Sequence, residues 1–147
     1  MIDILQEKIN IAQIPTIIKK LERISSFYKH SIYIKRDDLT GIAMSGNKIR
    51  KLEYLFHDAL KKNCNYIITC GGIQSNHARA TAVLSRQFGL KPILVLQGKE
   101  EEKDYNGNLF LDYLLDAEIH WIEPGVYGKD LHEKMYEISR KLINNGQ

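Results

Sequence analysis

Three cations stand where a helix is expected to begin. Lys48, Arg50 and Lys51 lie in the run SGNKIRKLEY (45–54), at the positive end of the helix dipole, where each cation costs a few tenths to about 1 kcal/mol. Lys48 and Lys51 are three residues apart and share one helix face, with no acid nearby in the sequence before Glu53. This arrangement suggests that a bound anion completes the site.

Lys48 could also carry out covalent chemistry. A lysine held among cations is expected to have a lowered pKa, because a like charge disfavours the protonated amine, and a neutral amine is what Schiff-base formation with a carbonyl needs. An amine nucleophile beside an anion site suggests a phosphorylated aldehyde as ligand. The alternative is a solvated helix face, which is the usual environment of an arbitrary lysine.

A second glycine-bearing turn, CGGIQSNHAR (70–79), precedes another expected helix. The glycine pair at 71–72 would let the backbone approach a ligand closely, and Ser75 and Asn76 fall at the N-cap and first turn, where free N–H groups favour an anion. The alternative is that Ser75 does no more than cap the helix. Four consecutive side chains nevertheless offer more hydrogen-bonding groups than a cap requires: Gln74, Ser75, Asn76 and His77.

The elements that must position these turns alternate from residue 31 onward, in the pattern of βαβ units. We expect strands at 31–36, 66–70, 92–97 and 118–123, and helices at 45–63, 75–88, 108–116 and 129–143. The sequence therefore predicts an α/β fold with a small, mostly parallel, doubly wound sheet and flanking helices. Both glycine turns would lie at the carboxyl end of a strand, where open α/β sheets bind ligands.

The two ends of the chain fit this repeat less well. The run IPTIIKKLERIS (14–25) has a short apolar segment after a proline and no partner strand within the repeat. It could cap the sheet or belong to another layer that this chain does not contain. The run LINNGQ (142–147) ends directly after a helix with a glycine that would usually lead into a further strand, so the chain looks as though it stops within a fold.

The amino-acid composition limits the classes of protein and partner that the sequence supports. A chain of 147 residues with 44% hydrophobic and 27% charged content suits one globular domain. Its net charge of +3 is dispersed among acids, so we expect no nucleic-acid partner. Cys64 and Cys70 form no CxxC pair, which predicts a reducing cytoplasm and no metal site. The sequence shows no signal peptide and no apolar run long enough to span a membrane, so we expect no membrane partner.

Four separated runs resemble one family of pyridoxal-phosphate enzymes, the 1-aminocyclopropane-1-carboxylate deaminases and D-cysteine desulfhydrases. They are IKRDDLTG (34–41), SGNKIRKLEYL (45–55), GGIQSNHAR (71–79) and GNLFLDYLLDAEIHWI (107–122). The resemblance runs from about Pro15 to the end, in the family's order and spacing. It implies the N-terminal part of a tryptophan-synthase-β-like fold, with pyridoxal 5′-phosphate as cofactor and a small amino acid as substrate.

The resemblance also implies roles toward the cofactor. Lys48 would form the Schiff-base link with pyridoxal phosphate and then act as the base on the substrate's α-carbon. Lys51, one turn further on, would support the cofactor phosphate or the local charge balance. Asn76 matches the asparagine that hydrogen-bonds the cofactor's 3′-oxygen.

The remaining side chains of the second turn would face the substrate. Ser75 matches the serine that binds the substrate carboxylate or takes part in proton transfer, and Gln74 and His77 would line the same turn. A histidine after QSN is more usual in the D-cysteine desulfhydrase branch, whereas the deaminases tend to have glutamine there. A lone histidine is also commonly just structural.

Members of the family are roughly twice as long, because a larger C-terminal domain carries the phosphate loop and the partner of the pyridine nitrogen. We expect residues 1–36 to pack with that absent domain and residues 37–147 to form the small α/β domain. The chain would then be the N-terminal part of a lyase that converts D-cysteine, or of a deaminase acting on 1-aminocyclopropane-1-carboxylate.

Two further hypotheses remain open at this point. A separate polypeptide or partner subunit could supply the C-terminal half and restore activity, or the chain could be a non-catalytic remnant that serves as an interaction module. Apolar surface that the large domain would cover favours association, so a homo-oligomer is also expected.

Overall fold

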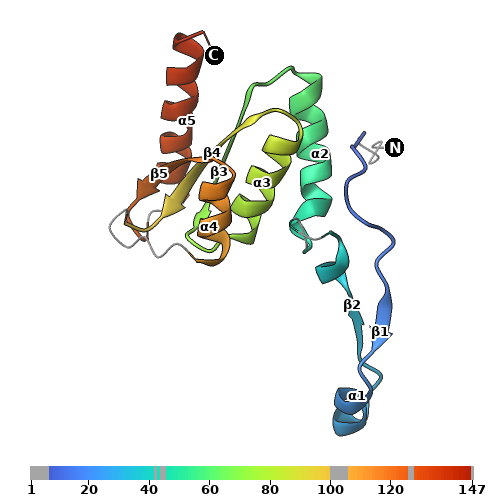
Figure 1. Cartoon of the computed structure of the whole chain (residues 1–147). Coiled ribbons are helices and arrows are strands. Elements are labelled where there is room, and N and C mark those ends of the chain that lie inside the picture. The colour runs from blue at the N-terminus through green and yellow to red at the C-terminus, as the bar shows by residue number, and fades with distance from the viewer. Residues whose placement is uncertain (1–6, 42, 44–45, 100–105, 126–127, 147) are drawn as a thin grey trace.

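Three parallel strands form the main sheet of the computed structural model, which describes residues 7–41, 43, 46–99, 106–125 and 128–146. The strands β3 (Tyr66–Gly72), β4 (Lys91–Gln97) and β5 (Glu118–Ile122) lie in the order β3-β4-β5. Their registers pair Tyr66 with Lys91 and Ile93 with Glu118. The helices α3 (Asn76–Gln87), α4 (Gly107–Leu114) and α5 (Lys129–Asn144) complete this part of the fold (Figure 1).

The central strand β4 is buried on both faces, because helices cover both sides of the sheet. Leu94 and Leu96 pack against α3 and α4, while Ile93 and Val95 pack against Ile138 of α5. A continuous apolar run is typical of such a strand. The predicted α/β fold with flanking helices is confirmed, with each helix and main-sheet strand close to its expected bounds.

Helix α2 (Lys48–Lys61) begins at the lysine singled out from the sequence and lies against α3. Its apolar residues follow the i, i+3, i+4 spacing of an amphipathic helix. Ile49, Leu52 and Phe56 form a buried cluster with Ala80 and Leu84 of α3. This packing fixes the N-terminus of α2 relative to that of α3.

The prediction of four strands in one sheet is wrong. Of the run 31–36, only Tyr33–Lys35 (β2) is a strand, and it pairs antiparallel with Ile18–Lys20 (β1) in a separate two-stranded sheet. The run IPTIIKKLERIS thus contributes β1, and does have a partner strand. The two strands are joined through the short helix α1 (Glu22–Tyr28). Antiparallel strands can be joined by a connection that turns back at one end of the pair, so β1 and β2 pair without a crossover over the main sheet.

We call residues 13–36, with β1, α1 and β2, the N-terminal arm. The arm projects away from the main sheet and its helices (Figure 1) and carries exposed apolar side chains: Phe27 is 79% exposed, Ile18 67% and Tyr33 60%. A groove of about 670 Å³ is lined by residues 19–24 with Phe27 and Tyr28. An apolar surface of this kind is typical of an interface.

Within the part of the chain described, no helix has the length and apolarity to cross a membrane.

The segment just before the arm lies against α2 and is held by a buried carboxylate. Glu53 is 2% exposed and accepts hydrogen bonds from the backbone N–H groups of Ile11 and Ala12, each at 2.8 Å, and from the ammonium of Lys8. Burial alone would raise the pKa of Glu53, but these donors outweigh it and lower the pKa. The carboxylate therefore joins residues 8–12 to the helix that begins at Lys48.

We expect Glu53→Ala to lower the free energy of unfolding by about 2–4 kcal/mol, because two backbone N–H groups and an ammonium lose their acceptor. Glu53→Gln, which keeps one acceptor oxygen, should lose less. Because the folded-state pKa is lowered, the carboxylate's contribution is present above its unfolded pKa and is lost as pH falls through the folded value. Urea unfolding at pH 7 and pH 4 checks both points; an unchanged stability in Glu53→Ala would contradict them.

Candidate functional site

The two glycine-bearing turns converge at the N-termini of α2 and α3. Lys48, the first residue of α2, is half-buried, and Lys51 is exposed. Both lie close enough to His77 in the first turn of α3 to lower its pKa by charge repulsion. Among the described residues, neither lysine forms an ion pair with a carboxylate. The structure thus brings the segment 48–51 and the segment 74–77 together, with two uncompensated cations between them.

His77 is half-buried at this junction. Burial, followed by the charges of Lys51 and Lys48, lowers the pKa of His77 to about 4, so its imidazole is neutral at pH 7. Its Nδ1 atom is buried and has no hydrogen-bond partner among the residues described. Buried polar atoms are rarely left without a partner. The junction of the two turns therefore contains an unsatisfied ring nitrogen.

Ser75 is the N-cap of α3, in extended backbone conformation. Its Oγ accepts a hydrogen bond from the backbone N–H of Ala78 at 3.1 Å. The prediction that Ser75 caps the helix is therefore confirmed. The hydroxyl hydrogen of Ser75 can still be donated to another group. Gly71 allows this close turn, because a Cβ there would lie 2.5 Å from both the Cβ and the Oγ of Ser75. A side chain at position 71 would displace the serine.

The side chain of Asn76 is oriented by two donors. Its Oδ1 accepts hydrogen bonds from Nδ2 of Asn108 at 3.0 Å and from a guanidinium nitrogen of Arg79 at 3.4 Å. These contacts identify the oxygen end of the amide, which leaves the NH₂ end to donate. Asn76 therefore presents a donor, the type of group that an oxygen acceptor on a ligand needs.

Gln74 braces the turn against the start of α4. Its Oε1 accepts from the backbone N–H of Asn108 at 2.8 Å, its Nε2 donates to Oδ1 of Asn106 at 3.0 Å, and its backbone carbonyl accepts from Nδ2 of Asn108 at 2.9 Å. Its side-chain amide is thus engaged at both ends. A substrate-binding role for Gln74 stays a prediction, and no local pattern in the sequence indicates this bracing function.

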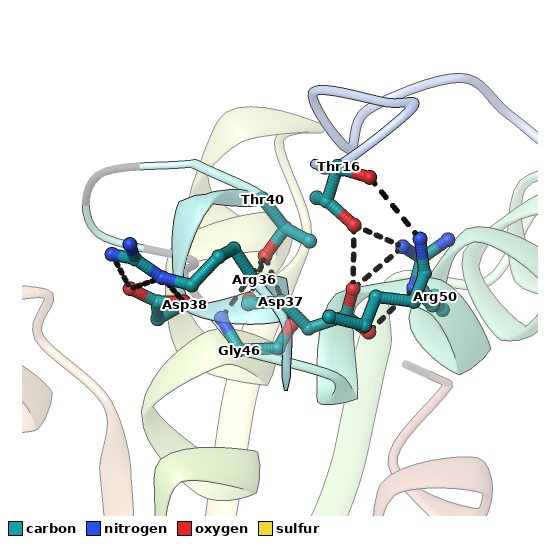
Figure 2. Close-up of polar contacts among 8 residues, drawn as sticks. Thr16, Arg36, Asp37, Asp38, Thr40, Gly46 and Arg50 are labelled. Atoms are coloured by element: carbon teal, nitrogen blue, oxygen red, sulfur yellow. Dashed lines mark hydrogen bonds and ion pairs between the residues drawn. The ribbon is translucent and has the colours of Figure 1, made fainter. Parts of the chain in front are cut away.

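The third cation, Arg50, has its counter-ion inside the protein (Figure 2). Its Nε and Nη2 donate to the two carboxylate oxygens of Asp37 at 2.8 and 2.7 Å, and Nη2 also donates to Oγ1 of Thr16 at 3.1 Å. The hydrogen bonds from Arg50 and Thr16 lower the pKa of Asp37 to about 2. The absence of a nearby acid in the sequence was misleading, because the acid comes from 13 residues earlier. Arg50 ties the arm to α2 and is not a candidate for anion binding.

A hydroxyl closes the loop that leads into Lys48. Oγ1 of Thr40 lies 3.0 Å from the carbonyl oxygen of Asp37 and 2.9 Å from that of Gly46, so either carbonyl can accept its one hydrogen, and it accepts from the N–H of Gly46 at 3.0 Å (Figure 2). The expectation that this loop follows a strand of the main sheet is wrong, because β2 belongs to the arm. The segment 34–41 instead contacts Gly46, two residues before Lys48, through these hydrogen bonds.

Comparison with known proteins gives one consistent result. Residues 9–146 match the family model described as "Pyridoxal-phosphate dependent enzyme". The chain is 53% identical over 135 residues to a Thermotoga maritima protein provisionally named 1-aminocyclopropane-1-carboxylate deaminase, covering 88% of this chain and 43% of that protein. It is 41% identical over 128 residues to the D-cysteine desulfhydrase of Serratia proteamaculans, covering 84% of this chain and 37% of the relative.

A solved structure agrees with these matches. The crystal structure of an ACC deaminase homologue superposes with a TM-score of 0.86 at 39% sequence identity, over 95% of this chain and 42% of that one. The chain therefore spans about two fifths of the length of the relatives it matches.

Proposed function

Because the chain belongs to the family of pyridoxal-phosphate-dependent enzymes, we propose that it supplies the lysine-bearing wall of a lyase site for a small amino acid. Lys48 is the residue that binds the cofactor aldehyde. The observation that carries this proposal is the convergence of Lys48 and Lys51 with the first turn of α3. The other wall belongs to a part of the family fold outside these 147 residues.

The residues present fit this cofactor. Two uncompensated ammonium groups suit an anionic ligand with an aldehyde, and the NH₂ group of Asn76 suits the 3′-oxygen on its ring. The orphaned Nδ1 of His77 lies beside the same lysines. When bound, pyridoxal phosphate withdraws electrons from the substrate's α-carbon.

The chain's own groups would handle protons and orientation. Lys48 takes the proton from the α-carbon, and Ser75 donates its hydroxyl hydrogen to the substrate carboxylate or takes part in proton transfer. The N-cap position of Ser75 supports this, because the helix N-terminus favours a carboxylate. Lys51 adds positive charge near the cofactor phosphate. Gln74 and His77 are proposed to line the substrate side of the turn.

We propose D-cysteine as the substrate, converted with uptake of water to a 2-oxoacid, ammonia and sulfide. The histidine at position 77, directly after QSN, favours this choice, as does the similarity to a D-cysteine desulfhydrase. The second candidate is 1-aminocyclopropane-1-carboxylate, which the similarity to the Thermotoga maritima protein favours.

The N-terminal arm is proposed to pack with the remainder of the family fold. Its exposed apolar groove and side chains support this assignment for residues 13–36, whereas residues 8–12 pack on α2. The same apolar surface would promote self-association of this chain, and we propose a homo-oligomer or a complex with a complementing C-terminal half. The cysteine content supports a place in the reducing cytoplasm.

A chimera tests the activity. Residues 1–147 would be joined to the C-terminal remainder of the Serratia proteamaculans D-cysteine desulfhydrase and assayed for sulfide release from D-cysteine and for ammonia release from 1-aminocyclopropane-1-carboxylate. We expect sulfide release that Lys48→Ala abolishes. The chain alone should show little turnover, because these residues would supply only one wall of the cofactor site and would hold the cofactor weakly. A folded chimera that releases ammonia only from 1-aminocyclopropane-1-carboxylate would favour the second candidate.

A further inference from the structure

The amide of Asn76 is held by residues from two different elements. Asn108, the second residue of α4, donates its Nδ2 to the Asn76 oxygen, and Arg79, one turn further along α3, donates to the same atom. An asparagine side chain on a helix could otherwise rotate and present either its oxygen or its nitrogen to a ligand. The two contacts select one orientation.

Asn108 is itself fixed. Its backbone N–H donates to Oε1 of Gln74 and its Nδ2 also donates to the Gln74 carbonyl, at 2.8 and 2.9 Å. The preceding Gly107 has φ +53°, a left-handed conformation that favours glycine, and a Cβ there would lie 2.4 Å from Oε1 of Gln74 and so displace it. The start of α4 is therefore built to bring the Asn108 amide against the turn that carries Asn76.

Arg79 extends the same support to the loop before Lys48. It is 6% exposed, and its Nη1 donates to the backbone carbonyl of Ala43. The carboxylate of Asp112 on α4 attracts it, partly offsetting the cost of burying the guanidinium. A single buried side chain thus contacts both the loop that leads into the Lys48 helix and the Asn76 amide.

We propose that Asn108 and Arg79 are positioning residues that hold the amide oxygen of Asn76 and thereby leave its NH₂ group to donate to the 3′-oxygen of the cofactor. This inference rests on the proposed function, because it assumes that pyridoxal phosphate binds at Lys48 and Asn76. It adds two residues to which the sequence analysis gave no role.

A double-mutant cycle on the 147-residue chain tests the proposal, with the dissociation constant for pyridoxal phosphate measured by absorbance titration. Asn108→Ala should weaken binding about 3- to 10-fold, the effect of one misdirected hydrogen bond. In the Asn76→Ala background the same substitution should have no effect, because Asn108 acts only through Asn76. Asn108→Asp, which replaces the donor by an acceptor, should weaken binding at least as much as Asn108→Ala.

Asn106→Ala is the matched control. It removes a contact to Gln74 in the same turn and leaves both hydrogen bonds to Asn76 in place, so the affinity should stay within about 2-fold of the wild type, a change below the net value of one hydrogen bond. Arg79→Lys, which keeps the charge but not the forked donor, should behave like Asn108→Ala. Thermal unfolding of every variant shows whether it is folded.

The outcomes separate the two claims. If the wild-type chain forms no adduct at Lys48 at any cofactor concentration, the proposed function fails and this inference fails with it. If the wild type binds but Asn108→Ala weakens binding equally with and without Asn76, or leaves it unchanged, only the positioning role is overturned.

Discussion

Lys48→Ala is expected to abolish covalent binding of pyridoxal phosphate, seen as loss of the visible absorbance that a lysine adduct of the cofactor gives. Lys48 is half-buried at the start of α2, and its amine has no carboxylate partner among the described residues. Among the described residues at this junction, Lys51 offers a second amine, and Lys51 is exposed. The substitution should be harmless to folding, because it removes a cation from the positive end of a helix.

Lys51→Ala is the matched control for this experiment. It removes a like charge one turn away and leaves the nucleophile, so the absorbance should persist while the affinity falls by about 10-fold through the lost attraction for the phosphate. Equal loss in both variants would show that the two lysines act only as a charged patch. Retention of the absorbance in Lys48→Ala would remove Lys48 from its proposed role.

Asp112→Asn is expected to stabilise the protein at alkaline pH. Asp112 is fully buried in α4, and neither carboxylate oxygen has a hydrogen-bond partner within the described residues. Burial raises the pKa of Asp112 to about 7 from an ordinary value of 3.8, although Arg79 lowers it. The buried carboxyl is therefore largely protonated below pH 7 in the folded chain and ionised in the unfolded chain.

The sign of the pH dependence follows from that difference. Between about pH 4 and pH 7 the folded state keeps a proton that the unfolded state has lost, so the free energy of unfolding falls as pH rises, by as much as about 4 kcal/mol in total. Asp112→Asn removes this loss of stability with rising pH, because the amide does not titrate. The variant should match the wild type near pH 4 and exceed its stability increasingly toward pH 8.

Chemical denaturation from pH 4.5 to pH 8.5 measures this effect, with the exposed Asp130→Asn as control for the general effect of removing an acid. A constant difference between Asp112→Asn and the wild type across that range would contradict the buried titration. Destabilisation at every pH would indicate instead that an ionised Asp112 is a net-favourable partner of Arg79.

The sequence predicted the elements that depend on local patterns. Helix α2 was found because Ile49, Leu52 and Phe56 recur on one face, and β4 because a continuous apolar run suits a strand covered on both sides. Burial and helix periodicity depend on the order of apolar and polar residues within a short segment. The α/β class and most boundaries of helices and strands could therefore be predicted from the sequence. The position of Lys48 at the start of a helix followed from the same pattern.

Pairing over long distances could not be derived in this way. The run 31–36 was recognisable as a strand, but nothing in its residues says that it pairs with β1 instead of β3. Arg50 likewise looked uncompensated because its partner, Asp37, reaches it only through the tertiary fold. Asn108 is 32 residues from Asn76, and no spacing rule connects the two. The contact between Asn108 and Asn76 exists only because α3 and α4 pack side by side in the folded chain.

The family assignment rests on separated motifs, and the chemistry rests on the arrangement of a few of their side chains. Lys48 came from one motif and Asn76 from another, and the structure brings both motifs to the junction of α2 and α3. The runs 34–41 and 107–122 carried no assigned role at first. In the structure, the first contacts Gly46, two residues before Lys48, and the second contacts the amide of Asn76.

Lys48 is proposed to be the residue that binds the cofactor. The most direct test of this role is to mix the chain with pyridoxal phosphate, reduce with borohydride and locate the modified lysine by peptide mass spectrometry. We predict that the label is concentrated on Lys48 at low cofactor concentration. A label spread evenly over the surface lysines, or concentrated on another lysine, would contradict the account.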